Sequence, residues 1–254
     1  MKKIYWGTIW IIVLCLGLSG CAKTQVIDSK SVIYKEYNKS NKKSNNKYTI
    51  VIDAGHQTHG NSKLEPIGPG AKQKKPKVSQ GTQGVSSKVP EYKVNLQVAL
   101  KLQTVLEDKG YKVVMVRTTN DVDISNAERA AIANQCDADA FIRIHCNGSE
   151  NSKTNGALTM CQTKKNPYCG ELHSKSRLLS DCVLKSLCKT TGAKNKGVTE
   201  TDSMSGINWC QVPVTIVEMG FMSNPKEDKK LVSDQYQDKL AKGIAVGIDS
   251  YFQK

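Results

Sequence analysis

The sequence has few prolines, few aromatic side chains and no apolar run long enough to span a bilayer. In 254 residues there are 7 Pro, 19 Gly and 6% aromatic residues, which excludes a collagen-like chain. With 39% apolar and 24% charged residues, the composition is that of an ordinary globular protein, and a coiled coil or wholesale disorder is excluded. No internal repeat is present. We therefore expect one domain with appendages.

The longest apolar run lies at the amino terminus. It covers residues 4–18 and follows Lys2 and Lys3, but it is shorter than the roughly 20 residues that a spanning helix needs. This pattern is typical of a signal peptide. The next residues, LSGC (18–21), resemble a bacterial lipobox. We therefore expect a lipoprotein signal peptide at 1–20 and a lipidated Cys21 that anchors the chain to the cell membrane on its extracytoplasmic side. An uncleaved signal anchor is the alternative.

Basic residues are concentrated in two segments. Residues 22–47 are rich in serine, asparagine and lysine and show no apolar period, so we expect a flexible tether over 21–47 and a folded domain over 48–254. Residues 57–90, interpreted as a loop, hold six lysines and one glutamate. These segments carry most of the formal charge of +14. Because no nucleic-acid-binding motif is present, we expect anionic wall polymers or lipid headgroups as partners, and no nucleic acid.

Strand and helix patterns alternate from residue 48 onward. This alternation predicts a single α/β domain with a mostly parallel sheet. Apolar periodicity and capping residues place the elements. Strands are expected at 48–53, 111–116, 138–144, 156–161 and 213–218, and helices at 91–109, 125–135, from about 172 to Gly192, from 224 and at about 235–251.

Ionisable residues follow three of the expected strands. His56 lies just beyond the first strand, His145 at the end of the third and Glu218 at the end of the fifth, while Glu91 opens the first helix. Ligands bind at the carboxyl edge of parallel strands, so these side chains reach one edge. Two histidines and one glutamate can hold a catalytic zinc ion, and the remaining carboxylate can act as a general base. The pattern does not decide which glutamate has which task.

Four segments resemble the motif blocks of one enzyme family. In chain order they resemble the blocks of the zinc-dependent N-acetylmuramoyl-L-alanine amidases of the amidase-3 family, over the whole of 48–254. The resemblance implies a central sheet of about six strands flanked by helices. It also implies that His56, Glu91 and His145 bind Zn²⁺ and that Glu218 is catalytic. The segments are IDAGH (52–56), PEY (90–92), IHCN (144–147) and VEMGFMSNP (217–225).

The resemblance implies hydrolysis of the amide bond between N-acetylmuramic acid and L-alanine in peptidoglycan. Glu218 would take a proton from water and pass it to the departing amino group. Two neighbours of His145 are further candidates. Arg143 shares its face of the strand and is expected either to pair with an acidic neighbour or to bind a substrate carboxylate. Asn147 is expected either to orient the ligand or to stabilise a turn.

Two other functions would use parts of the same sequence. A zinc peptidase that cuts within the stem peptide would use the same zinc ligands. A non-catalytic peptidoglycan-binding lipoprotein would need neither these ligands nor Glu218. Product analysis separates the first alternative from the amidase, and insensitivity to a chelator would favour the second. We expect a monomer in each case.

The remaining cysteines and histidines are interpreted as structural. Seven cysteines follow Cys21 without any Cys-x-x-Cys spacing, so a structural zinc finger is not expected. Up to three disulfides could form, but reduced buried thiols are preferred because the domain has enough core without them. His59 and His173 are expected at the surface. The seven cysteines are Cys136, Cys146, Cys161, Cys169, Cys182, Cys188 and Cys210.

Overall fold

The computed structural model describes residues 48–253. The expected signal peptide, Cys21 and the tether lie outside the described residues, so these assignments stay predictions. No helix in the described part of the chain is both long enough and apolar enough to cross a membrane.

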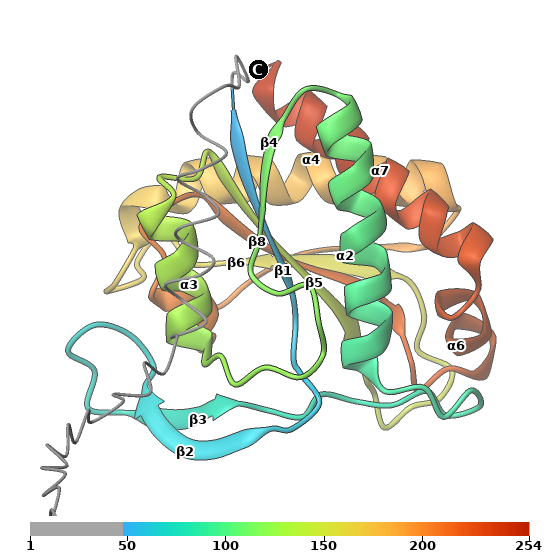
Figure 1. Cartoon of the computed structure of the whole chain (residues 1–254), viewed down its shortest axis with the longest axis horizontal. Helices are drawn as coiled ribbons and strands as arrows, with labels where there is room; N and C mark the ends of the chain where they lie inside the picture. The colour runs from blue at the N-terminus through green and yellow to red at the C-terminus, as the bar shows by residue number, and fades with distance from the viewer. Residues whose placement is uncertain (1–47, 254) are drawn as a thin grey trace, which may run out of the picture.

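A six-stranded sheet forms the centre of the domain (Figure 1). All neighbouring strands are parallel except one antiparallel pair, formed by the fourth and fifth strands of the spatial order. This sheet confirms the mostly parallel α/β architecture of about six strands. In spatial order the strands are β4 (Lys112–Met115), β1 (Thr49–Ala54), β5 (Ala140–Asn147), β8 (Val214–Phe221), β6 (Ala157–Cys161) and β7 (Asn195–Glu200).

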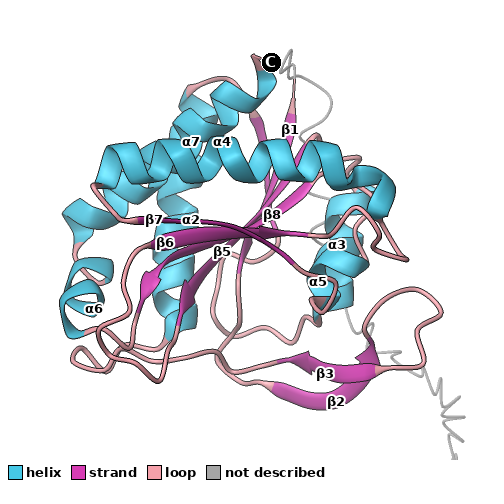
Figure 2. Cartoon of the chain, turned by 180° about the vertical axis from the view of Figure 1, so that it is seen from behind, coloured by secondary structure: helices cyan, strands magenta, loops and turns pink. Residues whose placement is uncertain are grey.

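Helices cover both faces of the sheet (Figure 2). Three long helices share a buried apolar cluster with one face, and two shorter helices share a second cluster with the other. The first group is α2 (Glu91–Asp108), α4 (His173–Thr191) and α7 (Asp234–Phe252); the second is α3 (Asn126–Gln135) and α5 (Ser205–Asn208). The remaining helices are α6 (Pro225–Leu231), after β8, and the 3₁₀ turn η1 (Gly170–Leu172), before α4.

The strand sequences explain this three-layer arrangement. Successive side chains of a strand point to opposite faces. In β1, Ile50 and Ile52 therefore join the cluster under α2, α4 and α7, whereas Val51 joins the cluster under α3. Because both faces are covered, β1 reads as a nearly continuous apolar run and not as an alternating one.

Helix ends follow the expected capping residues. The Ser125 hydroxyl accepts a hydrogen bond from the Glu128 backbone, and the Glu128 carboxylate accepts one from the Ser125 backbone, which completes a capping box before α3. Asn224 caps α6 with Pro225 at its first position. Gly192 ends α4 with φ of 73°, in the left-handed region that glycine tolerates.

Helices α4 and α7 pack closely because glycine removes a side chain between them. A Cβ atom at Gly247 would lie 2.5 Å from the Cα atom of Val183. Such a contact is closer than packed atoms allow, so a larger residue would separate the two helices.

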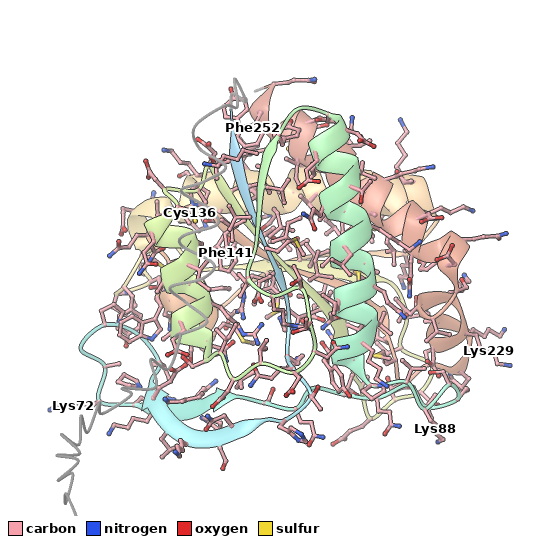
Figure 3. The ribbon with its side chains drawn as sticks, viewed as in Figure 1. Lys72, Lys88, Cys136, Phe141, Lys229 and Phe252 are labelled. Atoms are coloured by element: carbon pink, nitrogen blue, oxygen red, sulfur yellow. The ribbon has the colours of Figure 1, made fainter. Side chains whose placement is uncertain are left out.

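The lysine-rich segment contains a hairpin where a loop was expected. Strands β2 (Asn61–Pro66) and β3 (Lys74–Val78) pair antiparallel as a separate two-stranded sheet, and Lys72 projects from its turn (Figure 3). Its polar sequence carries almost none of the apolar alternation that marks a strand. Hydrogen bonds to the main domain hold the hairpin: Asn126 donates to the carbonyl of Lys77, and Trp209 donates to that of Pro66.

Two further elements were absent from the sequence interpretation, namely the edge strand β7 and the short helix α5. Strand β7 reads NKGVTE and contains one large apolar residue, and α5 has only four residues. In both elements the local sequence pattern is weak, and packing against neighbouring segments determines the secondary structure.

The cysteines follow the structural interpretation. All seven between residues 48 and 253 are reduced thiols, and all except Cys188 are buried. Several belong to the two apolar clusters. They therefore serve as small core side chains, as expected.

Candidate active site

Four side chains from distant parts of the sequence meet at the carboxyl edge of the sheet. Ligand atoms of His56, Glu91 and His145 all lie within 4.8 Å of one another. Glu218 on β8 is the register partner of His145 on β5 and lines the same pocket as both histidines. The convergence expected from the strand ends is thus present in the folded chain.

Glu91 is held from several directions at the first turn of α2. Its Oε2 atom accepts a hydrogen bond from the Thr82 backbone at 2.9 Å, and its Oε1 atom accepts from the Cys146 backbone and from Asn95, both at 3.1 Å. Burial acts to raise its pKa, but the close contacts with His145 and His56 outweigh burial and hold the pKa well below its ordinary value. Glu91 is therefore an ionised carboxylate at the centre of the cluster.

The backbone around His56 is shaped for this site. His56 itself has φ of 61°, uncommon for a residue with a side chain. Its Nδ1 atom donates to the carbonyl of Ser79 at 2.8 Å, and its Nε2 atom lies 3.2 Å from Glu91 Oε1. In the neutral ring, donation from Nδ1 leaves the lone pair of Nε2 on the side of Glu91, where a metal could bind.

Gly55 and Gly81 leave room for the site side chains. A Cβ atom at Gly55 would lie 2.1 Å from the His145 ring. At Gly81, which has φ of 81°, a Cβ atom would lie 2.7 Å from Glu91 Oε2 and 2.9 Å from the His56 ring. Both glycines are therefore required by close approach, and Gly81 is required by its positive φ as well.

Two buried polar atoms of residues that line the pocket have no hydrogen-bond partner within the described residues: His145 Nε2 and Glu218 Oε2. Burial lowers the pKa of His145 to about 4, so its ring is neutral near pH 7. Burial, and next the charge of Glu91, raise the pKa of Glu218 to about 8. Buried polar atoms are rarely left without a partner, and such exceptions mark functional positions.

These side chains border a pocket of about 230 Å³. Its polar wall contains both histidines, Glu218 and Arg143, and its apolar wall contains Met160, Met204 and Ile216. The pocket thus places a potential metal, a carboxylate and an apolar surface within reach of one small ligand.

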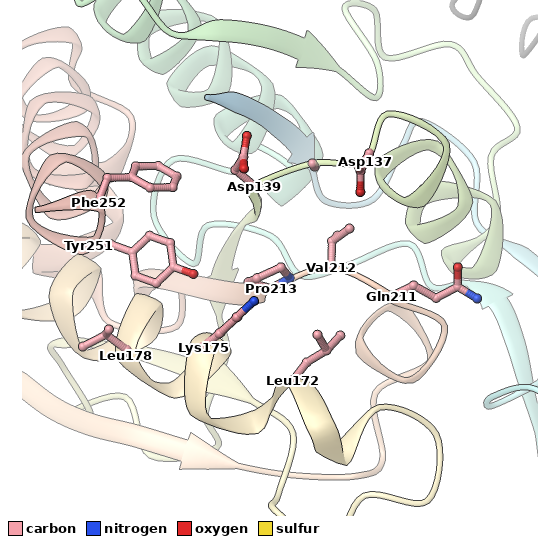
Figure 4. A pocket seen from close by; sticks show the side chains of 11 residues that line it. Asp137, Asp139, Leu172, Lys175, Leu178, Gln211, Val212, Pro213, Tyr251 and Phe252 are labelled. Carbon is pink, nitrogen blue, oxygen red and sulfur yellow. The ribbon is translucent and has the colours of Figure 1, made fainter. Parts of the chain in front are cut away.

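A second pocket, of about 490 Å³, lies elsewhere. It is at the opposite edge of the sheet, where the side chains of Asp137, Lys175 and Tyr251 line it (Figure 4). It contains no group of three metal-ligating side chains within the described residues. This second pocket is the larger of the two, but only the smaller pocket is lined by side chains that could bind a metal ion and transfer a proton. The smaller pocket is therefore the candidate active site.

The acidic partner expected for Arg143 is Asp53 on β1. Arg143 Nε donates to Asp53 Oδ2 at 2.9 Å, and Arg129 donates to Asp53 Oδ1 at 2.6 Å. Burial acts to raise the pKa of Asp53, but the two guanidinium groups outweigh it and hold the pKa below its usual range. This buried cluster lies directly behind the pocket, since Arg143 also lines it. The role of Arg143 in binding a substrate carboxylate stays a prediction.

The other candidates lie at the margin of the site. Asn147 Oδ1 accepts a hydrogen bond from the Gly148 backbone at 2.8 Å, which favours the turn-stabilising role. His59 is exposed in a loop, as expected. His173 differs from expectation, because it is half-buried with Nε2 3.0 Å from Glu200 Oε1.

Sequence reasoning missed Asn95, which supports the site from α2. Its side-chain nitrogen donates to Glu91 and to the carbonyl of Gly55 at 3.2 Å. A signal existed, because residues four apart on a helix share a face, so Asn95 follows Glu91 onto the buried side. The expected helix start at residue 91 would have been enough to find it.

The residues present fit a divalent metal ion. Two imidazoles and one ionised carboxylate are the donor set that zinc takes in catalytic sites with an open fourth position. Geometry supplies the independent observation: His56 Nε2 and His145 Nδ1 both lie 3.2 Å from Glu91 Oε1, so three donor atoms face one point that an ion could occupy. Glu218, outside this set, remains available for proton transfer.

Comparisons with known proteins identify the family of the domain. The family model described as N-acetylmuramoyl-L-alanine amidase matches residues 50–250. The sequence is 29% identical over 205 residues to the N-acetylmuramoyl-L-alanine amidase LytC of Bacillus subtilis, covering 81% of this chain and 36% of that protein.

Solved structures show the same fold. The N-acetylmuramoyl-L-alanine amidase from Clostridium difficile 630 matches with a TM-score of 0.66 at 29% identity, covering 82% of this chain and 98% of that one. The amidase Ami1 from Mycobacterium smegmatis matches with a TM-score of 0.75 at 22% identity, covering 83% and 99% of the two chains. The chain belongs to the N-acetylmuramoyl-L-alanine amidase family.

Proposed function

We propose that this protein is a zinc-dependent amidase that hydrolyses the bond between N-acetylmuramic acid and L-alanine in peptidoglycan. Family membership over residues 50–250 supports the enzyme class. The observation that carries the zinc dependence is the grouping of His56, Glu91 and His145, with ligand atoms within 4.8 Å of one another. His56, Glu91 and His145 would hold the ion.

The chain's own residues define how the reaction would proceed. When bound, zinc polarises the amide carbonyl and makes water a stronger acid. Glu218 Oε2, buried and without a hydrogen-bond partner among residues 48–253, takes the proton from the attacking water and returns it to the amino group of L-alanine. A pKa of about 8 suits both steps, because the carboxyl group can bind and release a proton near neutral pH.

The test is product analysis on purified peptidoglycan. The full chain with zinc should release stem peptides with a free N-terminal L-alanine and leave unsubstituted muramic acid, and a chelator should stop the reaction. Mass spectrometry of the digest distinguishes this outcome from cleavage within the stem peptide, which would contradict the proposal in favour of a zinc peptidase. Binding without any cleavage would indicate a non-catalytic wall-binding protein.

Variants of two glutamates separate the catalytic role from metal binding. Glu218→Gln should keep one bound zinc per chain while turnover falls by about 10²- to 10⁴-fold, the range of general acid-base assistance. Glu171→Gln, an exposed glutamate, should keep both zinc and activity. Near-wild-type hydrolysis by Glu218→Gln would remove this carboxylate from the mechanism.

We also propose that the protein acts from the membrane surface, facing the wall. The support is the lipobox-like LSGC at 18–21 after a short apolar run. Labelled fatty acid should be incorporated into the wild-type chain and into Cys15→Ala, but not into Cys21→Ala. Incorporation into Cys21→Ala would refute lipidation at this cysteine.

A further inference from the structure

The hairpin of β2 and β3 carries an excess of positive charge beside the candidate active site. Residues 61–78 contain five lysines and one glutamate. Lys63, Lys72 and Lys74 are exposed, and none has a carboxylate within 4.0 Å among residues 48–253. We refer to these three side chains as the lysine patch.

The hairpin's own glutamate does not neutralise the patch. Glu65 is 7% exposed, and its Oε1 atom accepts a hydrogen bond from the Ala127 backbone at 3.1 Å. It therefore points into the domain, where it fixes the hairpin against α3. Lys72 lies in the turn of the hairpin and Lys74 begins β3, two residues on, so their Cα atoms are at most about 7 Å apart. This is within the Debye length of about 8 Å at physiological salt, so their potentials add.

The hairpin that carries the patch borders the pocket. Ser79 follows β3 directly; it lines the pocket and its carbonyl accepts the hydrogen bond from His56. Lys75 donates to the carbonyl of Ser203 at 2.7 Å, next to Met204, another residue of the pocket wall. A long chain lying across the pocket would therefore continue onto the hairpin.

The hairpin also lies at the end of the domain remote from Tyr48. Figures 1 and 2 both place the start of β1 and the end of α7 at the top and the hairpin at the bottom. The chain enters the described domain at Tyr48, which stacks on Phe252 at 3.9 Å. A protein anchored through its N-terminus can thus direct the lysine patch away from the membrane and toward the wall.

We propose that the lysine patch binds a phosphodiester polyanion of the cell wall, so that the protein works on peptidoglycan that carries such a polymer. Lysine ammonium groups are compact charges that bind phosphate without demanding a fixed geometry. A flexible polymer with regularly repeated phosphates can contact all three. The proposal rests on the proposed function, because it concerns which form of peptidoglycan reaches the same pocket.

The test compares two triple variants of the full chain. In the patch variant, Lys63, Lys72 and Lys74 are changed to Gln. In the control variant, three exposed lysines of α4 and α7 are changed to Gln, so the net charge is the same. Binding to poly(glycerol phosphate) at low salt should weaken at least about threefold in the patch variant, as expected when three surface ion contacts are lost. The control lysines are Lys185, Lys239 and Lys242.

Further arms make the outcome decisive. Replacing the three patch lysines by Arg should restore binding, and hydrolysis of a soluble, phosphate-free muropeptide should be equal in all variants. Equal polymer binding by patch and control variants would overturn the proposal. So would an equally large loss on phosphatidylglycerol vesicles, which would assign the patch to membrane lipids. If no variant hydrolysed any substrate, the proposed function would fail, but the binding comparison would still decide the role of the patch.

Discussion

Replacing Asp53 by Asn should destabilise the fold far more than its single lost charge suggests. Asp53 lies on β1 with a fully buried side chain, between Arg129 at 2.6 Å and Arg143 at 2.9 Å. The Arg129 side chain is also fully buried, and that of Arg143 is 4% exposed. Asparagine nearly conserves the volume, so the change leaves two buried cations without their counter-charge.

The expected loss is about 3–5 kcal/mol of unfolding free energy, the usual cost of breaking a buried ion pair by removing one partner. Typical domains are stable by about 5–15 kcal/mol, so the variant should be close to unfolding. The pKa of Asp53 is held below its ordinary value of 3.8. Its charge therefore stabilises the fold fully above about pH 4, and this contribution is lost as pH falls toward the lowered pKa.

Urea unfolding of the full chain at pH 7 measures the effect. Asp121→Asn provides the matched control, because Asp121 is exposed and should change stability by less than about 0.5 kcal/mol. The difference between Asp53→Asn and the wild-type chain should shrink below about pH 4. A loss at pH 7 no larger than that of the control would refute the reasoning that this pair of arginines depends on Asp53.

Three other predictions follow from close contacts and burial. Gly55→Ala should weaken zinc affinity at least about tenfold in calorimetric titration, because its Cβ atom would overlap the His145 ring; unchanged affinity would contradict the geometry. Gly247→Ala should cost about 1–3 kcal/mol in urea unfolding, whereas the exposed Val246→Ala should be nearly neutral; equal effects would mean that α4 and α7 tolerate a Cβ atom. Burial raises the pKa of Glu218 to about 8. In protein kept metal-free by a chelator, protonated Glu218 therefore stabilises the fold at low pH, and this stabilisation is lost as the pH rises through 8. Glu218→Gln should then gain up to about 1.4 kcal/mol per pH unit over the wild-type chain between about pH 5 and 8, and a constant difference would refute the raised pKa.

The main features of the site could be predicted because they follow from strand ends. Buried parallel strands have long apolar sequences, and the polar residue that ends each of them stands out, as His56 does after β1 and His145 near the end of β5. Their meeting needs only the rule that parallel strands end at the same edge. The register pairing of His145 with Glu218 agrees with that rule.

What could not be predicted depends on contacts between segments far apart in the chain. The β2–β3 hairpin is stabilised by hydrogen bonds to Asn126 and Trp209, and its own sequence has little apolar periodicity. The ion pairs of Asp53 with Arg129 and Arg143 depend on how α3 and β5 pack against β1, and no local sequence pattern predicts that packing. Asn95 is an exception, because helix periodicity alone places it on the same face as Glu91.

The anchoring of Glu91 has a consequence for the order of assembly. Backbone groups of Thr82 and Cys146 and the side chain of Asn95 orient its carboxylate without any ion. Small zinc-finger domains gain their folding energy from the metal and unfold without it. Here the large apolar core and these hydrogen bonds supply the order instead, so we expect the polypeptide to fold completely before any metal ion binds.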